Sequence, residues 1–269
     1  MTTRDEAICQ ICAGPARPAF EATMLGRHPV RYYFCPRCQH LRTQQPFWLA
    51  EAYSSAIARA DTGLVMRNLK IARQLCCLLY EFCDREGRFL DLAGGTGLLV
   101  RLLRDVGFDA YWEDGYCDNQ HAVGFEAPAG STGYAAVTAF EALEHMEEPL
   151  AFIEGAVARS ASGTFVFTTE LFENTPPPAD WWYYAMPTGQ HISFFTRLTL
   201  ETIARRLNLT FLSDRGMHML TRLDISPRQY AKVVKKSGHG LYEKVCERMH
   251  SRTQDDHARM LRLSQPGPA

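Results

Sequence analysis

Four cysteines near the start of the chain have the spacing of metal ligands. Cys9 and Cys12 form one C-x-x-C pair, Cys35 and Cys38 form a second, and 22 residues separate the two pairs. Each pair can turn two thiolates toward one point, and two pairs supply the tetrahedral four-sulfur set that Zn²⁺ prefers. The sequence therefore predicts a zinc ribbon, with a redox pair or unrelated thiols as the alternative. A closed ligand set leaves no open coordination position, so we expect this zinc to stabilise the fold and not to catalyse.

The neighbouring histidine and the cysteines further along the chain have a different context. His40 follows Cys38 too closely to replace a ligand, and we expect a surface or packing role. Cys76, Cys77 and Cys83 lie in a helical apolar pattern, which favours buried core thiols.

A glycine-rich turn is the second feature with chemical meaning. Residues 91–97 read Asp-Leu-Ala-Gly-Gly-Thr-Gly, between an apolar run at 88–90 and an amphipathic run at 98–103, as expected for strand, turn and helix. Glycines let a ligand approach the backbone closely, and the helix start offers free N–H groups. Asp114 lies about 20 residues further on, where a carboxylate can accept hydrogen bonds from both ribose hydroxyls of an adenosine. The alternative is a tight turn that binds no ligand.

The order of the acid and the glycines distinguishes between two kinds of nucleotide-binding turn. Dinucleotide-binding turns of the G-x-G-x-x-G type need a third glycine where this chain has Val100. The acid instead precedes the glycines, which resembles motif I of class I S-adenosylmethionine (SAM) methyltransferases. Ala93 stands at that motif's first glycine, a mild change that should still allow the turn. The resemblance implies that SAM is bound by Asp91, Ala93, Gly95, Gly97 and Asp114.

Residues 139–149, Ala-Phe-Glu-Ala-Leu-Glu-His-Met-Glu-Glu-Pro, carry a second resemblance. They are similar to the segment after the fourth strand of many small-molecule methyltransferases, which lines the cofactor and begins the next helix. The resemblance implies cofactor contacts for Phe140 and Glu141. His145 is a candidate catalytic residue, although hydrogen bonding by Glu144 and His145 that orients the turn is the favoured role.

Residues 176–196 are dense in proline and aromatic side chains, which excludes a helix or an interior strand and predicts a loop that holds substrate. Thr196 is expected to be the N-cap of the following helix. The segment resembles the Glu-His-x-x-Tyr-Phe-Ser stretch of zinc-containing bacterial sugar methyltransferases, with Gln190 in place of the Glu and His191 as the candidate general base. Four aromatic residues precede them: Trp181, Trp182, Tyr183 and Tyr184. We expect these rings either to form a wall against which one face of a sugar packs or to pack in the core beneath the loop.

These segments fit an α/β fold, with a Rossmann-like, mostly parallel sheet of the class I methyltransferase type and a small N-terminal zinc ribbon. We expect the ribbon at 1–45, helices covering the cofactor cleft at 46–86, the SAM-binding domain at 87–225 and a helical extension at 226–269. Within 46–86 the helices are expected from Phe47 to Ile57 and from Thr62 to Cys83. A short strand is also expected near 123–126.

Composition excludes several classes of function. The chain has 269 residues and a net charge of −1, so no strong basic field is available for a polyanion. No apolar run is long enough for a membrane span, and the first residues do not resemble a signal peptide, so we expect a cytoplasmic protein. Residues 174–177, Asn-Thr-Pro-Pro, follow the wrong strand to be the motif of nucleobase amino-methyltransferases.

The expected function is SAM-dependent methyl transfer to a small molecule, most plausibly a sugar or sugar nucleotide. Two alternatives stay open. One is an RNA methyltransferase that uses the ribbon to contact RNA, which a basic face on the ribbon would favour. The other is a non-catalytic SAM-fold subunit, for which loss of the cofactor motif would be expected; Asp91, Gly95, Gly97 and Asp114 are all present.

Overall fold

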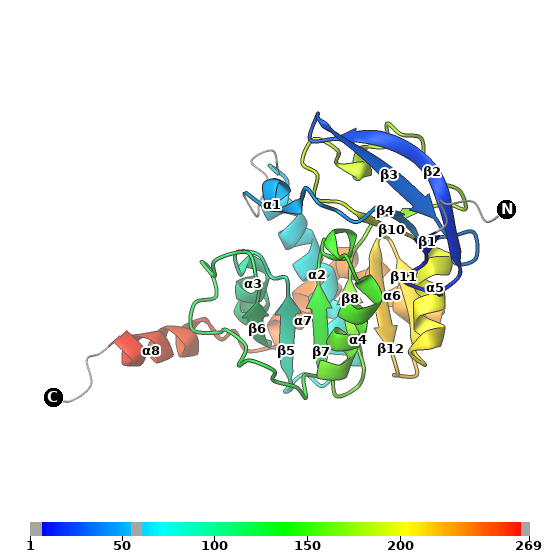
Figure 1. Ribbon diagram of the computed structural model, residues 1–269. Coiled ribbons are helices and arrows are strands. Elements are labelled where there is room, and N and C mark those ends of the chain that lie inside the picture. The colour runs from blue at the N-terminus through cyan, green and yellow to red at the C-terminus, as the bar shows by residue number, and fades with distance from the viewer. Residues whose placement is uncertain (1–6, 55–60, 265–269) are drawn as a thin grey trace.

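The computed structural model describes residues 7–54 and 61–264, which build two six-stranded sheets lying one above the other (Figure 1). The lower sheet has the order β11-β12-β8-β7-β5-β6. Its strands are β5 (Arg88–Leu92), β6 (Asp109–Glu113), β7 (Ala136–Ala139), β8 (Phe165–Phe167), β11 (Thr210–Asp214) and β12 (Met217–Thr221). Strands β6, β5, β7 and β8 are parallel, whereas β12 pairs antiparallel with β8 and β11 pairs antiparallel with β12. This confirms the expected α/β class and its mostly parallel sheet.

Apolar residues fill both faces of this sheet, as a parallel sheet covered by helices requires. Successive residues of one strand enter opposite cores: Phe89 packs with one cluster and Leu90 with the other. The first face is covered by α2 (Leu64–Phe82), α3 (Leu98–Val106), α6 (Pro227–Lys236) and α7 (Tyr242–Arg248). The second face is covered by α4 (Pro149–Arg159) and α5 (Arg197–Arg206).

The upper sheet joins two distant parts of the chain in the order β1-β2-β3-β4-β10-β9. Its first four strands come from the N-terminal segment: β1 (Ala7–Ile8), β2 (Pro15–Met24), β3 (His28–Phe34) and β4 (Leu41–Thr43). The last two are β10 (Ser193–Thr196) and β9 (Leu171–Phe172). A short helix, α1 (Leu49–Ala52), follows the N-terminal strands (Figure 1).

The prediction that residues 176–196 contain no interior strand is wrong at their end. Ser193–Thr196 forms β10, which pairs with β4 on one side and with β9 on the other. Proline and glycine are confined to residues before Ile192, and the sequence Ser-Phe-Phe-Thr suits a strand. Residues Trp182–Tyr184 form a single 3₁₀ turn. Thr196 does begin α5 as predicted, in a capping box with Thr199.

Two other local expectations need correction. Residues 123–126 form no strand; only one isolated bridge joins Glu126 to Trp112. The helix expected from Phe47 is the single turn Leu49–Ala52, and residues 55–57 of that expectation lie outside the described part of the chain. The helix expected from Thr62 to Cys83 is α2 (Leu64–Phe82), within two residues of its expected bounds.

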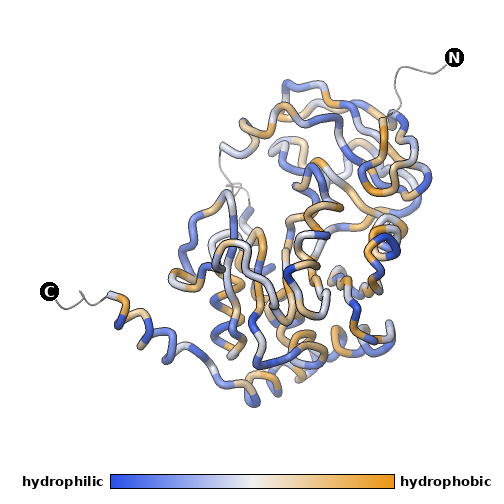
Figure 2. Tube along the Cα trace, turned by 60° about the horizontal axis from the view of Figure 1, so that its bottom comes forward, coloured by the Kyte–Doolittle hydropathy of each residue, from blue (hydrophilic) through white to orange (hydrophobic). Residues whose placement is uncertain are grey.

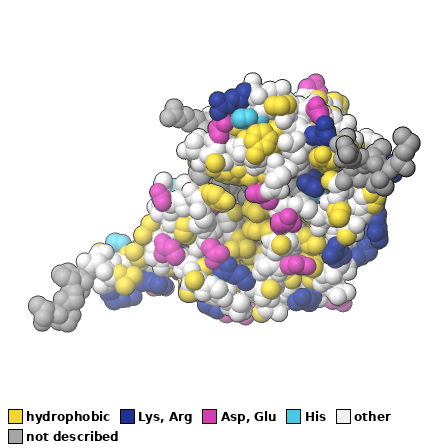
Figure 3. Space-filling model, viewed as in Figure 1, with side chains coloured by type: hydrophobic (Ala, Val, Ile, Leu, Met, Phe, Trp, Pro, Cys, Tyr) yellow, Lys and Arg dark blue, Asp and Glu magenta, His cyan; other side chains and the backbone are white. Residues whose placement is uncertain are grey.

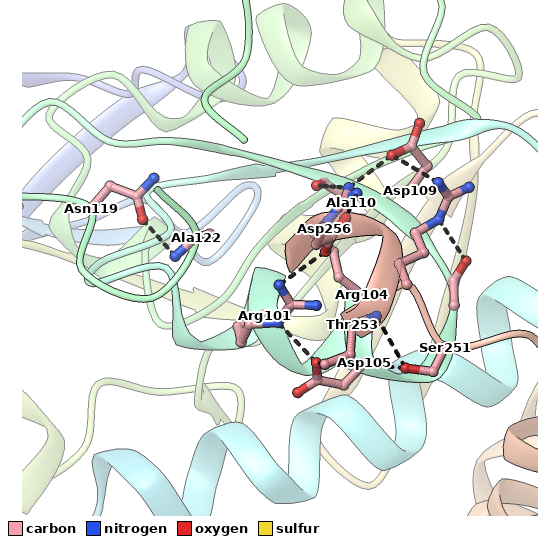
Figure 4. Close-up of polar contacts among 12 residues, drawn as sticks. Arg101, Arg104, Asp105, Asp109, Ala110, Asn119, Ala122, Ser251, Thr253 and Asp256 are labelled. Carbon is pink, nitrogen blue, oxygen red and sulfur yellow. Dashed lines mark hydrogen bonds and ion pairs between the residues drawn. The ribbon is translucent and has the colours of Figure 1, made fainter. Parts of the chain in front are cut away.

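A last helix, α8 (Thr253–Ser264), extends from the body beside α3 (Figure 1). Asp256 anchors it by accepting hydrogen bonds from Arg104 Nε and Nη2 at 2.8 and 2.7 Å, and it also pairs with Arg101 at 2.9 Å (Figure 4). Its first five residues are polar, and apolar residues occur among polar ones in its later part (Figure 2). Among the described residues, no helix has both the length and the apolar character needed to cross a membrane.

Candidate active site

The glycine-rich turn and Asp114 are in direct contact. Asp114 Oδ2 accepts a hydrogen bond from Gly95 N at 2.9 Å, while its Oδ1 accepts from Tyr116 N and Cys117 N at 2.7 and 2.8 Å. Gly95 has φ +54°, and a Cβ placed on it would meet no described atom within 4 Å. The carboxylate therefore fixes the turn while the glycine leaves one side of it open.

The turn needs left-handed backbone at three places. Gly97 has φ +82°, and a Cβ there would lie 2.5 Å from Asn119 Oδ1. Ala93, at the position where the family motif has glycine, also has a positive φ, +51°. Left-handed backbone costs an L-residue about 1–2 kcal/mol. The alanine thus allows the turn, as expected, but under backbone strain.

Asp91 lies beneath the turn with its side chain buried. Its Oδ1 accepts a hydrogen bond from Thr138 Oγ1 at 2.5 Å. Burial raises the pKa of Asp91 to about 7; the hydrogen bond from Thr138 opposes the shift and the charge of Asp114 adds to it. A buried carboxylate that titrates near neutrality would be held ionised by a cationic group, such as an amino acid's ammonium.

Phe140 and Glu141 follow the carboxyl end of β7, on the strand edge where the turn after β5 also lies. Phe140 is partly buried against the core of α2 and α3. Glu141 has φ +52°, and its Oε1 accepts a hydrogen bond from Thr168 Oγ1 at 2.7 Å. Burial, and then the charge of Glu144, raises the pKa of Glu141. Strained backbone of this kind is concentrated at functional sites.

Tyr53 is a residue of this region that sequence reasoning missed. Its ring stacks on Tyr116 with centroids 5.1 Å apart, and its hydroxyl lies 3.1 Å from His145 Nδ1. The segment after α1 therefore reaches from the Asp114 turn to the histidines. Helical periodicity gave no signal for Tyr53, because its role depends on where the chain crosses the strand edge.

His145 and His191 are brought together although they are distant in sequence. Their rings meet edge to face with centroids 4.8 Å apart. Backbone carbonyl oxygens accept from both rings: that of Gln190 lies 3.1 Å from His145 Nδ1, and that of Tyr183 lies 2.7 Å from His191 Nδ1. Burial, and then the charge of His191, lowers the pKa of His145 to about 3, so this imidazole is neutral.

Glu144 completes this group. One carboxylate oxygen of Glu144 and one ring nitrogen of each histidine lie within 4.8 Å of one another. The Glu144 side chain is fully buried, and neither oxygen has a hydrogen-bond partner in the described part of the chain. The expected orienting hydrogen bond from this side chain is therefore not seen. The link to the next segment is made by backbone, since Glu144 O accepts from Ile192 N at 2.8 Å.

The four aromatic residues of the predicted wall are in ring contact but differ in exposure. Trp182 is 72% exposed, whereas Tyr183 and Tyr184 are buried and Trp181 is half-buried. The Tyr184 ring packs among Tyr32, Trp181 and Phe194, which favours the packing alternative for this residue. Gln190 is also buried, and its Nε2 donates to Ala52 O at 3.0 Å.

The four N-terminal cysteines meet as predicted. Cys9 Sγ lies 3.5 Å from Cys38 Sγ, and Cys12 Sγ lies 3.5 Å from Cys35 Sγ, with all four sulfurs within 4.8 Å of one another. A tetrahedral zinc site with Zn–S bonds of about 2.3 Å needs sulfurs about 3.8 Å apart, so the cluster fits a zinc ribbon. Burial raises the pKa of Cys35, a cost that a bound dication removes.

His40 and the other cysteines are placed as the sequence suggested. His40 is buried, with Nε2 2.8 Å from Ser193 Oγ, so it packs between β4 and β10. Cys76 and Cys77 are fully buried in α2, and Cys83 is half-buried at its end.

Comparison with known proteins gives one family. Residues 67–214 match the family described as "Methyltransferase domain". Among curated proteins, none matches the sequence.

Solved structures also match. The mitomycin 7-O-methyltransferase MmcR is 11% identical with a TM-score of 0.44, over 64% of this chain and 59% of that one. A family 2 O-methyltransferase from Planctomyces limnophilus, in complex with apigenin, is 11% identical with a TM-score of 0.44, over 65% of each chain. DesVI of Streptomyces venezuelae is 14% identical with a TM-score of 0.44, over 61% of this chain and 98% of that one. The chain thus spans less than two thirds of the length of the first two proteins.

Proposed function

The chain belongs to the methyltransferase domain family. From this premise we propose that it is a SAM-dependent methyltransferase whose acceptor is a polar small molecule, most plausibly a sugar or sugar nucleotide. The observation that carries the proposal is the group Glu144, His145 and His191 on the same strand edge as the glycine turn. Such an enclosed polar group suits an acceptor with hydroxyls.

On the cofactor side, the residues present fit SAM. The glycine turn would admit the methionine part, Asp114 would accept from the ribose hydroxyls, and Asp91 would attract the ammonium directly or through water. Phe140 and Glu141 would flank the cofactor from the end of β7. When bound, SAM supplies an electrophilic methyl group on a sulfonium. The chain's contribution is then to hold acceptor and donor in line and exclude water, which can lower a barrier by about 7–11 kcal/mol.

On the acceptor side, His191 remains our candidate for the group at which the acceptor's proton is removed. Because its Nδ1 donates to Tyr183 O, the Nε2 lone pair is available to a hydroxyl. His145, with Nδ1 held by Gln190 O, would position the acceptor from the other side. Trp182, the exposed aromatic of this segment, offers a face on which a sugar ring can stack.

The four cysteines are proposed to hold a structural zinc ion. All of its ligands would come from the protein. The segments that carry these cysteines contact the helices of the lower sheet, since Thr199 Oγ1 of α5 donates a hydrogen bond to Cys38 O at 2.8 Å. The ion would therefore stabilise the junction between the two sheets and take no part in chemistry.

Transfer of a radiolabelled methyl group from SAM tests this function. Wild type, Asp114→Ala and His191→Ala are compared on free sugars, nucleotide sugars, and transfer and ribosomal RNA. We expect label on a sugar-type acceptor, loss of SAM affinity in Asp114→Ala, and retained SAM affinity with at least a hundredfold lower turnover in His191→Ala. Label on RNA and never on small molecules would overturn the acceptor class.

The RNA alternative has little support from the surface. On the face shown in Figure 3, Lys and Arg side chains are interspersed with Asp and Glu. On the ribbon, Arg31 pairs with Glu21 at 2.9 Å, so its charge is locally compensated. The non-catalytic alternative would be favoured if purified protein neither bound SAM nor changed its melting temperature with SAM.

A further inference from the structure

The group Glu144, His145 and His191 has a feature that methyl transfer by itself does not explain. Its carboxylate is fully buried and has no hydrogen-bond partner among the described residues. An ionised carboxylate in such a place is costly unless a positive charge lies against it. A positive charge next to Glu144 would remove this cost.

Among the described residues, no neighbouring side chain places a positive charge directly against Glu144. Glu141, a second carboxylate, lies within electrostatic range of Glu144. Arg67, the described arginine closest to these acids by its ion pairs, is bonded to Asp61 at 2.6 Å and lies 3.9 Å from Glu141. The net field of this group is thus suited to a cation.

Both imidazole rings are oriented as metal ligands usually are. A carbonyl oxygen can only accept, so the contact with Tyr183 O places the proton of His191 on Nδ1. On His145, donation from Nδ1 to Gln190 O, with Tyr53 Oη 3.1 Å away as a second acceptor, places the proton on Nδ1 as well. Each Nε2 then carries a free lone pair. A ligating histidine almost always donates its other N–H to a carbonyl or carboxylate in this way, which fixes its tautomer and direction.

We propose that Glu144, His145 and His191 bind one divalent transition-metal ion, with the remaining coordination positions open to the acceptor. Two imidazole nitrogens and one carboxylate oxygen on one side of an ion form a donor set suited to first-row ions such as Mn²⁺ or Fe²⁺. The four-cysteine cluster, all sulfur and closed, selects a different ion, so one chain carries two metal sites of different chemistry.

The proposal rests on the proposed function and makes it more specific. An acceptor hydroxyl bound to the ion has a lowered pKa and loses its proton to water. As its oxygen forms the new bond to the methyl carbon, the carbon–sulfur bond breaks and sulfur keeps the electron pair. His191 then acts through the ion as a ligand, and this replaces its role as the base that takes up the proton itself.

Titration with Mn²⁺ tests the site without any substrate. Binding is measured as the decrease of the six-line electron paramagnetic resonance signal of free Mn²⁺. Full-length protein with its cysteine site loaded with zinc is titrated, and the same titration is made with Glu144→Gln and with His191→Asn. Glu154→Gln, an exposed position on α4, is the matched control. We expect one Mn²⁺ per chain and a raised melting temperature in wild type and in the control. Affinity should fall at least a hundredfold in the two site variants.

The outcomes separate this proposal from the proposed function. Mn²⁺ binding that is absent in wild type, or equally strong in Glu144→Gln, overturns the metal site. A second result would also overturn the metal site: methyl transfer persists after a chelator has removed Mn²⁺ but not zinc, and His191→Ala still abolishes it. That result would restore His191 as the base. Mn²⁺ bound by wild type and lost in Glu144→Gln upholds the site even where no small molecule accepts a methyl group.

Discussion

The proposed cofactor half and the proposed acceptor half of the site are assembled in different ways. The cofactor half comes from consecutive residues, 91–97, and one further acid, Asp114, at the ends of the neighbouring strands β5 and β6. The acceptor half comes from Tyr53, the turn Leu143–His145 and the segment before β10. Short-range sequence determines the first, whereas long-range strand pairing within the upper sheet determines the second. Damage to the upper sheet should therefore affect the acceptor half first.

Cys35→Ser is expected to have the largest effect. Loss of one of four ligands should release zinc and destabilise the protein by about 3 kcal/mol or more, because the cysteines pack in the same core as Leu90 and Val137. Methyl transfer should fall further than SAM affinity does, since β4 holds β10 beside His191. Zinc content, melting temperature and SAM titration are measured, with Cys246→Ser at an exposed position as the control. Equal losses of SAM affinity and turnover would contradict the contrast between the halves.

An intermediate effect is expected from pH at Asp91. Its pKa is raised from 3.8 to about 7 by burial, so the folded protein holds a proton there that the unfolded chain releases. Without ligand, stability should therefore fall as pH rises from about 4 to about 7, where the buried group becomes charged. The ammonium of SAM favours the charged form, so affinity for SAM should rise between about pH 6 and about pH 7.5.

Calorimetric titration of SAM at these two pH values measures the effect. Asp91→Asn should bind SAM roughly tenfold or more weakly at the higher pH and show little pH dependence. Glu154→Gln serves as the control that keeps the wild-type profile. A pH dependence that survives in Asp91→Asn would show that another group is responsible.

The smallest expected effect comes from the strained turn. Ala93→Gly removes the Cβ from a residue with φ +51° and should stabilise the protein by about 1 kcal/mol. Ala151→Gly, at an exposed position of α4, should destabilise by about 0.5–1 kcal/mol. Urea denaturation of both variants measures the difference. A loss of stability in Ala93→Gly would mean that the alanine methyl makes contacts worth more than the strain.

The sequence was informative where one motif carries the geometry. The strand, turn and helix at residues 88–106 follow from glycine, charge and apolar periodicity alone, whereas the contact of the turn with Asp114 is a finding of the structure. The four cysteines were equally clear, since their spacing permits few other arrangements. His191 was singled out through a family resemblance, and the structure does bring it to His145.

The remaining features of the fold and the site depend on long-range strand pairing, which local sequence patterns do not encode. The strand β10 was hidden by the prolines before it, and its place between β4 and β9 is a long-range choice. Without that register, neither the meeting of His145 with His191 nor the orphaned carboxylate of Glu144 can be derived. Tyr53 was missed for the same reason.

The pairing of Ser193 with Arg42 and of Phe194 with Leu41 limits how this protein can be recombined with its relatives. A graft cut after residue 45 would strip β10 of one neighbour and leave its backbone amides and carbonyls without their partners. The portable unit is discontinuous: the cysteine-bearing strands have to travel with residues 171–196. Chimeras that exchange these two segments together would be the way to change the acceptor while the glycine turn and Asp114 stay intact.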